Sequence, residues 1–371
     1  MNPPFADSLL FSHVRRLART NPVRPLAQLH LSEIRRVLVV LTTGLGDAIL
    51  STPVLPALRA AMPGAEIRLF CRAAWAPLFA TDPDLDAVIP YAGKYRRFFA
   101  TLRALSKFHP DLTVVLHGND PDILPLCYLA GSPFIVRIPT TGTRYGFLLS
   151  NREREADRAT LPGLHYIENR LRILDTLGIP PVTHSPRVHL AGELRRRNND
   201  ALRGEIGPGP YWVLHAHAAD AYKVWPMEKA RALLERVRAC RPGHAVVLTG
   251  GAQDREDLER LAAGMAGVHN FAGRLDIAGT AAALGGAACV VAPDTGVAHL
   301  ASALDIPLVA LYAPTRAEWI GPRARTAVPV ILQKPRTCDP CVEKQCPYTP
   351  KNCMDQIGVD EVFDALTHTL H

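Results

Sequence analysis

The stretch Asp294-Thr295-Gly296-Val297-Ala298-His299-Leu300-Ala301-Ser302-Ala303-Leu304 directly follows the apolar run Ala287-Ala288-Cys289-Val290-Val291-Ala292. The apolar run predicts a buried strand, and the small residues after it predict a helix. Asp294 or Thr295 can cap that helix with a side-chain oxygen. The free N–H groups and the positive end of the helix dipole would then face a bound anion such as a pyrophosphate. An ordinary strand-to-helix junction with a capping residue is the alternative interpretation.

The alternation of apolar strands and helical segments continues on both sides of this stretch. Apolar runs of strand length occupy residues 37–41, 67–71, 88–90, 112–116, 134–138, 211–215, 245–249 and 308–312. This alternation predicts doubly wound parallel sheets, and Pro180, Pro181 and Pro186 mark a linker between two halves. The expected class is therefore α/β, with two Rossmann-like domains facing a central cleft. The predicted limits are 1–34 for a basic N-terminal extension, 35–182 and 183–335 for the two domains, and 336–371 for a Cys-rich segment with a C-terminal helix.

The overall composition narrows the class of protein. The chain has 371 residues, is 48% apolar and has a formal net charge of +7. These values suit a folded soluble enzyme with anionic partners. We expect a cytoplasmic protein, because the sequence has no secretory signal pattern and no apolar run of about 18 residues. Aromatic residues make up only 6% and do not alternate with a basic stripe, which argues against nucleic-acid binding.

The first 34 residues contain apolar positions from Phe5 to Leu17 that alternate with Arg15, Arg16 and Arg19. The pattern predicts a basic amphipathic helix. Such a helix could lie on an anionic membrane. A loosely docked or frayed terminal helix is the alternative, because chain termini are often poorly ordered.

The first polar motif is Gly44-Leu45-Gly46-Asp47, which follows the strand predicted at 37–41. Ile49 occupies the position of the third glycine of a dinucleotide-binding fingerprint, so the motif does not indicate NAD. Asp47 could be a helix N-cap. It could also be a general base, with the two glycines giving a substrate room to approach.

The second polar motif runs from His215 to Pro226 and contains Lys223. A lysine near a helix N-terminus is poorly placed for the helix dipole unless it faces a bound phosphate. A solvated lysine is the alternative. Gly250-Gly251, directly after another predicted strand, forms a turn that could line the same pocket.

The C-terminal segment contains four cysteines, Cys338, Cys341, Cys346 and Cys353, within sixteen residues. The segment is too polar for a core, and in a cytoplasmic chain such a cluster is more often a metal site than a disulfide framework. We predict a structural zinc ion here without a catalytic role. Free thiols or disulfides are the alternatives.

Taken in order, these motifs resemble family 9 glycosyltransferases, the lipopolysaccharide heptosyltransferases and their relatives. The resemblance covers roughly residues 36–365. It is carried by Gly44-Leu45-Gly46-Asp47 with Ala48-Ile49-Leu50-Ser51-Thr52-Pro53, Lys223-x-Trp225-Pro226, Asp294-Thr295-Gly296-x-x-His299-Leu300, and Ala313-Pro314-Thr315 with Gly321-Pro322. The terminal cysteine cluster also resembles one found in part of that family.

The resemblance implies the GT-B arrangement and an inverting, metal-independent transfer of a sugar from a nucleotide diphosphate. In heptosyltransferases the donor is ADP-heptose and the acceptor is the inner core on lipid A. The first domain would bind the acceptor and the second the donor. Asp47 would be the general base, Lys223 would assist catalysis at the donor phosphates, and the enzyme would lie in the cytoplasm or peripherally on the inner membrane. The donor-binding residues would be Gly44, Gly46, His215, Lys223, Gly250, Asp294, Thr295, Gly296 and His299.

Three other interpretations stay open at this stage. The donor could be another nucleotide sugar, because the residues after Asp47 fit the broad family better than any acceptor-specific group. The chain could be an epimerase of the same fold or a nicotinamide enzyme, although it lacks a recognisable ribose-binding acid. It could also be an inactive, membrane-associated binding protein, against which the joint presence of Asp47, Lys223 and Asp294 argues.

Overall fold

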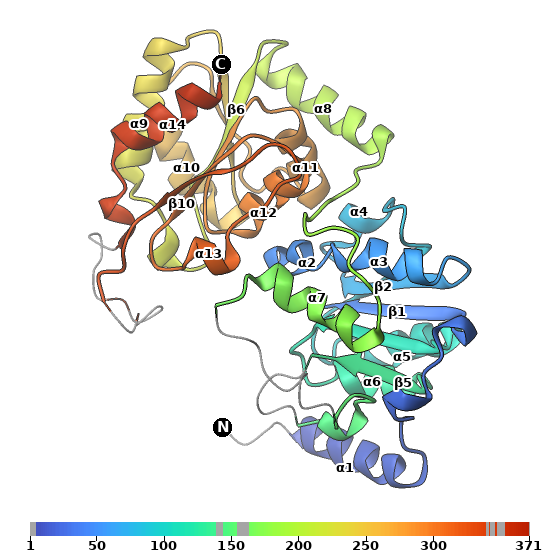
Figure 1. Ribbon diagram of the computed structural model, residues 1–371. Helices are drawn as coiled ribbons and strands as arrows, with labels where there is room; N and C mark the ends of the chain where they lie inside the picture. The colour runs from blue at the N-terminus through green and yellow to red at the C-terminus, as the bar shows by residue number, and fades with distance from the viewer. Residues whose placement is uncertain are drawn as a thin grey trace. The chain divides into compact units, whose positions relative to one another are not determined.

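The computed structural model describes residues 5–138, 144–153, 163–338, 341, 346 and 353–370 of the chain. The chain divides into two compact units, Met1–His184 and Ser185–His371 (Figure 1). Each unit contains one sheet in which all strand pairs are parallel. The predicted class, α/β with two Rossmann-like domains, is therefore confirmed.

The sheet of unit 1 has the strand order β3-β2-β1-β4-β5. Its strands are β1 (Arg36–Leu41), β2 (Glu66–Arg72), β3 (Ala87–Tyr91), β4 (Leu112–His117) and β5 (Phe134–Arg137). The chain adds β2 and β3 on one side of β1 and then crosses to add β4 and β5 on the other side. The crevice beyond the carboxyl ends of β1 and β4 is thus a topological switch point, where open α/β sheets bind ligands.

The helices of unit 1 cover this sheet. They are α1 (Phe5–Thr20), α2 (Leu45–Leu50), α3 (Val54–Ala61), α4 (Ala76–Phe79), α5 (Phe98–Phe108), α6 (Ile123–Leu129) and α7 (Tyr166–Leu177). α5 contacts α6, and both contribute to one buried cluster with side chains of β1, β2 and β4. α7 contacts α2, α3 and β4. It ends at Gly178, whose φ of +69° suits glycine.

The residues after the turn at Gly44–Asp47 predict a helix from Ala48 to Ala61 that starts late or is kinked at Pro53 and Pro56, and the structure differs from this prediction. The helix begins earlier, because Gly44 is the N-cap of α2, and it breaks at Ser51–Pro53 before α3 begins. Pro53 has no N–H with which to continue the helical hydrogen bonds, and the Ser51 hydroxyl donates to the carbonyl of Asp47 over 2.7 Å. Asp47 therefore lies in the first turn of a six-residue helix rather than in a loop.

The N-terminal helix is docked on unit 1. α1 contacts α6, Val14 is fully buried, and Leu10, Phe11 and Leu17 pack against the same cluster as α5 and α6. The apolar side of this helix is thus covered by protein, which corrects the interpretation that it lies on a membrane through that side. Among the described residues, no helix has the length and apolar character needed to span a membrane.

The sheet of unit 2 has the strand order β11-β10-β9-β6-β7-β8. Its strands are β6 (Tyr211–His215), β7 (Ala245–Thr249), β8 (Val268–Asn270), β9 (Val290–Pro293), β10 (Leu308–Tyr312) and β11 (Val330–Gln333). The topology repeats that of unit 1, because β7 and β8 lie on one side of β6 and β9 to β11 lie on the other. The switch point of unit 2 is therefore between β6 and β9.

The helices of unit 2 are α8 (Gly192–Ile206), α9 (Met227–Cys240), α10 (Arg255–Ala262), α11 (Ile277–Gly285), α12 (Gly296–Ala303), α13 (Ala317–Ile320) and α14 (Val359–Thr369). α9, α10 and α14 supply Leu233, Leu258 and Val362 to one buried cluster on the sheet, whereas α11 contacts α8 and α12 (Figure 1). The C-terminal helix α14 is thus part of the core of unit 2.

Candidate active site

Asp47 lies at the switch point of unit 1, in the first turn of the helix that follows β1. Its Oδ1 atom is 3.5 Å from a terminal nitrogen of Arg170 and 4.0 Å from Nε2 of His117. His117 ends β4 and Arg170 lies in α7, so three elements converge on this carboxylate. The Asp47 side chain keeps 33% of its surface exposed, which leaves it accessible to a ligand.

Two arginines, Arg170 and Arg137, act on His117 in the cluster beside Asp47. Arg170 has 14% of its side chain exposed, and Arg137, at the end of β5, is buried. Burial lowers the pKa of both guanidinium groups. The charge of Arg170 lowers the pKa of Arg137 further. The Asp47 carboxylate acts in the opposite direction on Arg170 and raises its pKa. Arg170 is thus balanced in part by Asp47, whereas Arg137 donates from a terminal nitrogen to Oδ1 of Asn119 over 3.4 Å. A bound anion would stabilise both guanidinium groups.

His117 is held in its neutral form at this site. Burial lowers its pKa to about 4, the charge of Arg170 acts in the same direction, and Asp47 opposes it. Its buried Nδ1 atom has no hydrogen-bond partner among the residues that the structure describes. A neutral imidazole here can donate or accept a hydrogen bond without adding charge to the cluster.

The sequence predictions missed His117, Arg137 and Arg170. A signal existed for two of them, since His117 directly follows a run of apolar strand residues and Arg137 interrupts one. Arg170 lies in a helix with several charged residues, and nothing in its spacing distinguishes it from the solvated ones.

The switch point of unit 2 contains a buried ion pair. Lys223, in the 3₁₀ helix Ala221–Lys223, donates from Nζ to Oδ2 of Asp294 over 2.7 Å, and the Thr315 hydroxyl donates to the same oxygen over 2.7 Å. Lys223 keeps 16% of its side-chain surface exposed and Asp294 only 5%. The structure thus brings together two predicted residues, and it adds Thr315.

The helix after β9 begins as the sequence predicts. Thr295 is the N-cap of α12, and its hydroxyl accepts a hydrogen bond of 3.4 Å from the backbone N–H of Ala298. Gly296 is the first helical residue, and His299 is buried within the helix. Asp294 does not cap α12 in this structure, because its carboxylate oxygen Oδ2 is engaged by Lys223 and Thr315.

His215 and Gly250 lie at the carboxyl ends of the neighbouring strands β6 and β7. His215 Nδ1 is 3.1 Å from the Thr249 hydroxyl, and burial lowers the pKa of this histidine to about 4. A Cβ atom at Gly250 would approach Asp254 to 3.0 Å and Leu258 to 3.1 Å. Close packing against α10 therefore explains this glycine, and its donor-binding role stays a prediction.

Gly44 and Gly46 lie in unit 1, whereas the other predicted donor-binding residues lie in unit 2. A Cβ atom at Gly44 would have only Asp47 Oδ2 within 4 Å, at 3.9 Å, and the glycine is exposed. The open space beside it agrees with the predicted close approach of a substrate. Gly46 lies within α2, half-buried, and its donor contact stays a prediction.

The two buried histidines predict a specific pH dependence of stability. In the folded protein His117 and His215 stay neutral down to a pH of about 4, whereas in the unfolded chain each is protonated below about 6.5. The unfolded state therefore binds more protons in this window, so the free energy of unfolding should fall as the pH drops from 6.5 toward 4. When the urea midpoint of unfolding is plotted against pH across this range, the slope should be shallower for His215→Gln than for wild type. His13→Gln, at an exposed position, should keep the wild-type slope. Equal slopes for all three proteins would contradict the assignment.

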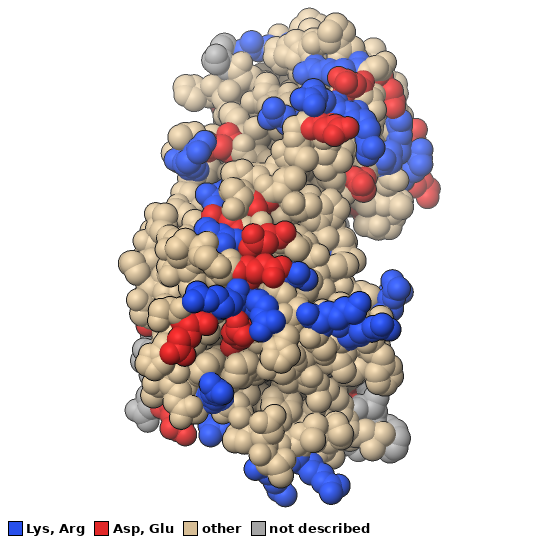
Figure 2. All heavy atoms as spheres, turned by 90° about the vertical axis from the view of Figure 1, so that its right-hand side faces the viewer, with Lys and Arg blue, Asp and Glu red and all other residues tan. Residues whose placement is uncertain are grey.

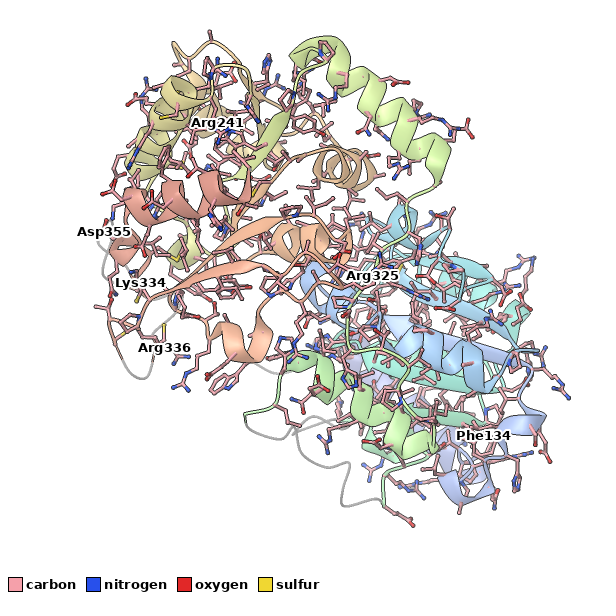
Figure 3. The ribbon with its side chains drawn as sticks, turned by 45° about the horizontal axis from the view of Figure 1, so that its top comes forward. Phe134, Arg241, Arg325, Lys334, Arg336 and Asp355 are labelled. Atoms are coloured by element: carbon pink, nitrogen blue, oxygen red, sulfur yellow. The ribbon has the colours of Figure 1, made fainter. Side chains whose placement is uncertain are left out.

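Unit 2 also contains an open pocket of about 720 Å³ beyond the ends of β10 and β11. Lys334 and Arg336, labelled in Figure 3, are two of its cationic side chains, and Lys334 is paired with Glu361 over 2.9 Å. None of the predicted donor-binding residues lines it. The lining comprises Ala313, Arg316, Ala317, Glu318, Ile331, Gln333, Lys334, Pro335 and Arg336.

The predicted zinc ligands are free cysteines in the structure. Cys353 is buried and its sulfur lies 3.0 Å from both the backbone nitrogen and the hydroxyl of Thr337, whereas Cys338, Cys341 and Cys346 are half-buried. Residues 339–340, 342–345 and 347–352 of this segment lie outside the described residues. Within the described part of the chain no group of three or more His, Cys, Asp or Glu is arranged to hold a metal ion, and zinc stays a prediction.

Comparison with known proteins places this architecture in a family. The profile described as glycosyltransferase family 9 (heptosyltransferase) matches residues 128–352. The lipopolysaccharide heptosyltransferase 1 of Pseudomonas aeruginosa is 31% identical over 333 residues, which cover 85% of this chain and 88% of that protein. The solved ADP-heptose lipopolysaccharide heptosyltransferase II of E. coli has a TM-score of 0.72 and 20% identity, covering 90% of this chain and 98% of that one. The E. coli heptosyltransferase WaaC, solved with ADP, has a TM-score of 0.69 and 22% identity, covering 90% and 99%.

The two parallel-sheet units and the two structural likenesses define the GT-B fold class, and the family profile with the 31% identical relative defines a glycosyltransferase. More particularly, the chain belongs to glycosyltransferase family 9, the heptosyltransferase family.

Proposed function

We propose that this enzyme transfers heptose from ADP-heptose to the inner core of a lipopolysaccharide or a related glycolipid. The similarity to lipopolysaccharide heptosyltransferase 1 over 85% of the chain supports the substrate class. The structural neighbours include a heptosyltransferase solved with ADP, which supports an adenine nucleotide as donor. Residues 35–182 would bind the acceptor and residues 183–335 the donor.

The observation that carries the mechanism is the position of Asp47, a partly exposed carboxylate at the switch point of the first sheet. We infer that it removes the proton from the acceptor hydroxyl as the hydroxyl oxygen attacks the anomeric carbon. The bond from that carbon to the diphosphate oxygen breaks in the same displacement, so the configuration inverts. The proton ends on Asp47 and the leaving group is ADP.

The charge that develops on the leaving diphosphate needs compensation, which Lys223 and the N–H groups at the start of α12 can supply without a metal ion. Asp294 holds Lys223 at 2.7 Å through one of its three N–H donors, which leaves the other two for phosphate oxygens. No metal is thus required in this proposal. A zinc ion at the four cysteines would be structural.

The largely buried guanidinium groups of Arg137 and Arg170 suit an anionic acceptor. Because both of these cations act on the same buried histidine, His117, a carboxylate or phosphate on the acceptor sugar would stabilise them together. A lipid-borne acceptor also implies that the enzyme works from the cytoplasm at the surface of the inner membrane.

The choice of donor can be tested by thermal unfolding in the presence of ADP, UDP, GDP, CMP and NADH. A ligand that binds only the folded state adds about 2.7 kcal/mol of stability at a concentration of 100 times its Kd. We expect a rise in Tm of several degrees with ADP and no comparable rise with the others. A rise with UDP or GDP would replace the proposed donor, and a rise with NADH alone would contradict the function. Incubation with ADP-heptose and a core acceptor, followed by mass spectrometry of the glycolipid, tests the transfer itself.

A further inference from the structure

Unit 1 contains two stretches with an uneven distribution of charge. Residues 8–30 and 92–110 contain no Asp or Glu but nine basic residues: Arg15, Arg16, Arg19, Arg24, Lys94, Arg96, Arg97, Arg103 and Lys107. The whole chain has a net charge of +7, so the other residues together carry −2. All nine of these side chains are exposed. We call the surface that they form the basic face.

The two stretches lie next to each other in the fold. Asp7 of α1 accepts a hydrogen bond from the Tyr95 hydroxyl and lies 3.8 Å from Nζ of Lys94. Phe11 of α1 and Phe98 of α5 pack against the same buried cluster. Figure 2 shows Lys and Arg side chains at the lower end of the face that it presents, the end at which α1 lies in Figure 1.

Two large apolar side chains of the same two stretches are also exposed. Phe99, in the first turn of α5, is 82% exposed, and Leu9 of α1 is 56% exposed. The backbone before Phe99 is strained, because Tyr95 and Arg97 have φ values of +55° and +53°. After this turn Phe98 packs against the buried cluster, and the exposed Phe99 contacts unit 1 through an edge-to-face contact with Phe98 at 5.6 Å between ring centroids.

We propose that the basic face docks on an anionic phospholipid bilayer, with Phe99 and Leu9 entering the interfacial region between the head groups. Exposed arginines and lysines on two stretches that contain no Asp or Glu complement a negatively charged membrane surface, and Asp7 outside these stretches forms an ion pair only with Lys94 among the interactions described. An exposed aromatic ring and a leucine among them match the composition of interfacial anchors. The inference deepens the proposed function and rests on it, because it names the surface through which the enzyme reaches a lipid-borne acceptor.

This arrangement differs from an amphipathic helix that lies on the membrane through its apolar side. The apolar side of α1 is buried against unit 1, so α1 contributes its arginines, and the strongest apolar anchor comes from α5. The docking surface is therefore preformed by the fold of unit 1.

Flotation of the full-length protein with vesicles tests the proposal. Vesicles of phosphatidylcholine with phosphatidylglycerol should bind it, with an affinity that falls as salt is added, whereas phosphatidylcholine alone should bind it weakly. Loss of one basic side chain should weaken binding about five-fold, so the triple variant Arg15→Gln/Arg16→Gln/Arg19→Gln should weaken it about 100-fold. Phe99→Ser should weaken binding even at low salt.

Unit 2 offers a matched control for the triple arginine variant and one for Phe99→Ser. Arg195, Arg196 and Arg197 are three consecutive exposed arginines of α8, and Val328 is 84% exposed. Their replacement by Gln and Ser, respectively, should leave vesicle binding within about two-fold of wild type, because neither lies on the basic face. Equal losses from both triple variants would overturn the proposal, since total charge alone would then explain binding.

Two further outcomes separate this proposal from the proposed function. Transfer to a water-soluble, lipid-free acceptor fragment should be unchanged in the triple variant and in Phe99→Ser. If the wild-type enzyme transfers heptose but does not bind phosphatidylglycerol vesicles, the docking proposal is wrong and the function stands. If single-stranded RNA binds as tightly as the vesicles and Phe99→Ser has no effect, the basic face is a general polyanion surface and the proposal is likewise wrong.

Discussion

Replacement of Asp47 by Asn is expected to lower kcat by about 10²- to 10⁴-fold and to leave the Kd for ADP almost unchanged. The asparagine keeps the size of the side chain but cannot accept the proton of the acceptor hydroxyl. Its effect should therefore appear in the transition state and not in donor binding. Steady-state kinetics with saturating acceptor, together with calorimetric titration of ADP, measure the two quantities separately.

A matched control is available at the same edge of the sheet. Asp120 follows β4 and pairs with Arg72 over 3.5 Å, with 22% of its side chain exposed. If Asp47 is the base, Asp120→Asn should keep kcat within a few-fold of wild type. Loss of activity in Asp120→Asn with retention in Asp47→Asn would transfer the role of base to Asp120.

Removal of the whole side chain in Asp47→Ala should add a structural effect to the catalytic one. Arg170 would lose the carboxylate at 3.5 Å, and a largely buried cation without its partner destabilises a fold. Both variants should thus melt below wild type and share the loss of kcat, and Asp47→Ala should melt lowest because the Asn amide oxygen can still accept from Arg170. Melting of both variants at the wild-type temperature would show that Asp47 does not stabilise Arg170.

The sequence was sufficient to predict the features that depend on local patterns. Apolar runs located the strands of both sheets except β8 and β11, because the central strands of parallel sheets are covered on both faces. β8 and β11 are edge strands of three and four residues that are only partly buried. β8 lacks an apolar run, whereas the three apolar residues that begin β11 were too few to predict a strand. The turn at Gly44 and the cap at Thr295 were also predictable, since each depends on neighbouring residues.

The features that depend on contacts between distant segments could not be predicted. Arg170 reaches Asp47 across more than a hundred residues, and no local pattern reports that approach. Lys223 and Asp294 were each predicted to lie near the donor, but their mutual ion pair follows from the adjacency of β6 and β9, which sequence order does not reveal. The same limit applies to the docking of α1, whose amphipathic pattern fits a protein surface and a membrane equally well.

The ion pair between Lys223 and Asp294 leads to the second prediction of large effect. Lys223→Ala should weaken ADP binding by about 10- to 100-fold. This range corresponds to the loss of one hydrogen bond between charged groups, which contributes roughly 1.5–3 kcal/mol. It should also destabilise unit 2, because Asp294 would keep a buried charge without its cation. Breaking a buried pair from one side costs about 3–5 kcal/mol.

The double variant Lys223→Ala/Asp294→Ala separates these two effects. It removes both charges, so it should regain much of the stability lost in Lys223→Ala, but it should not regain affinity for ADP if Lys223 contacts the phosphates. Lys229 provides the control, since it pairs with Asp355 over 3.0 Å in the same unit with 23% of its side chain exposed. Lys229→Ala should affect stability without changing the Kd for ADP. Recovery of wild-type ADP affinity in the double variant would mean that Lys223 serves only to neutralise Asp294, and the phosphate contact would then have to come from the N-terminus of α12.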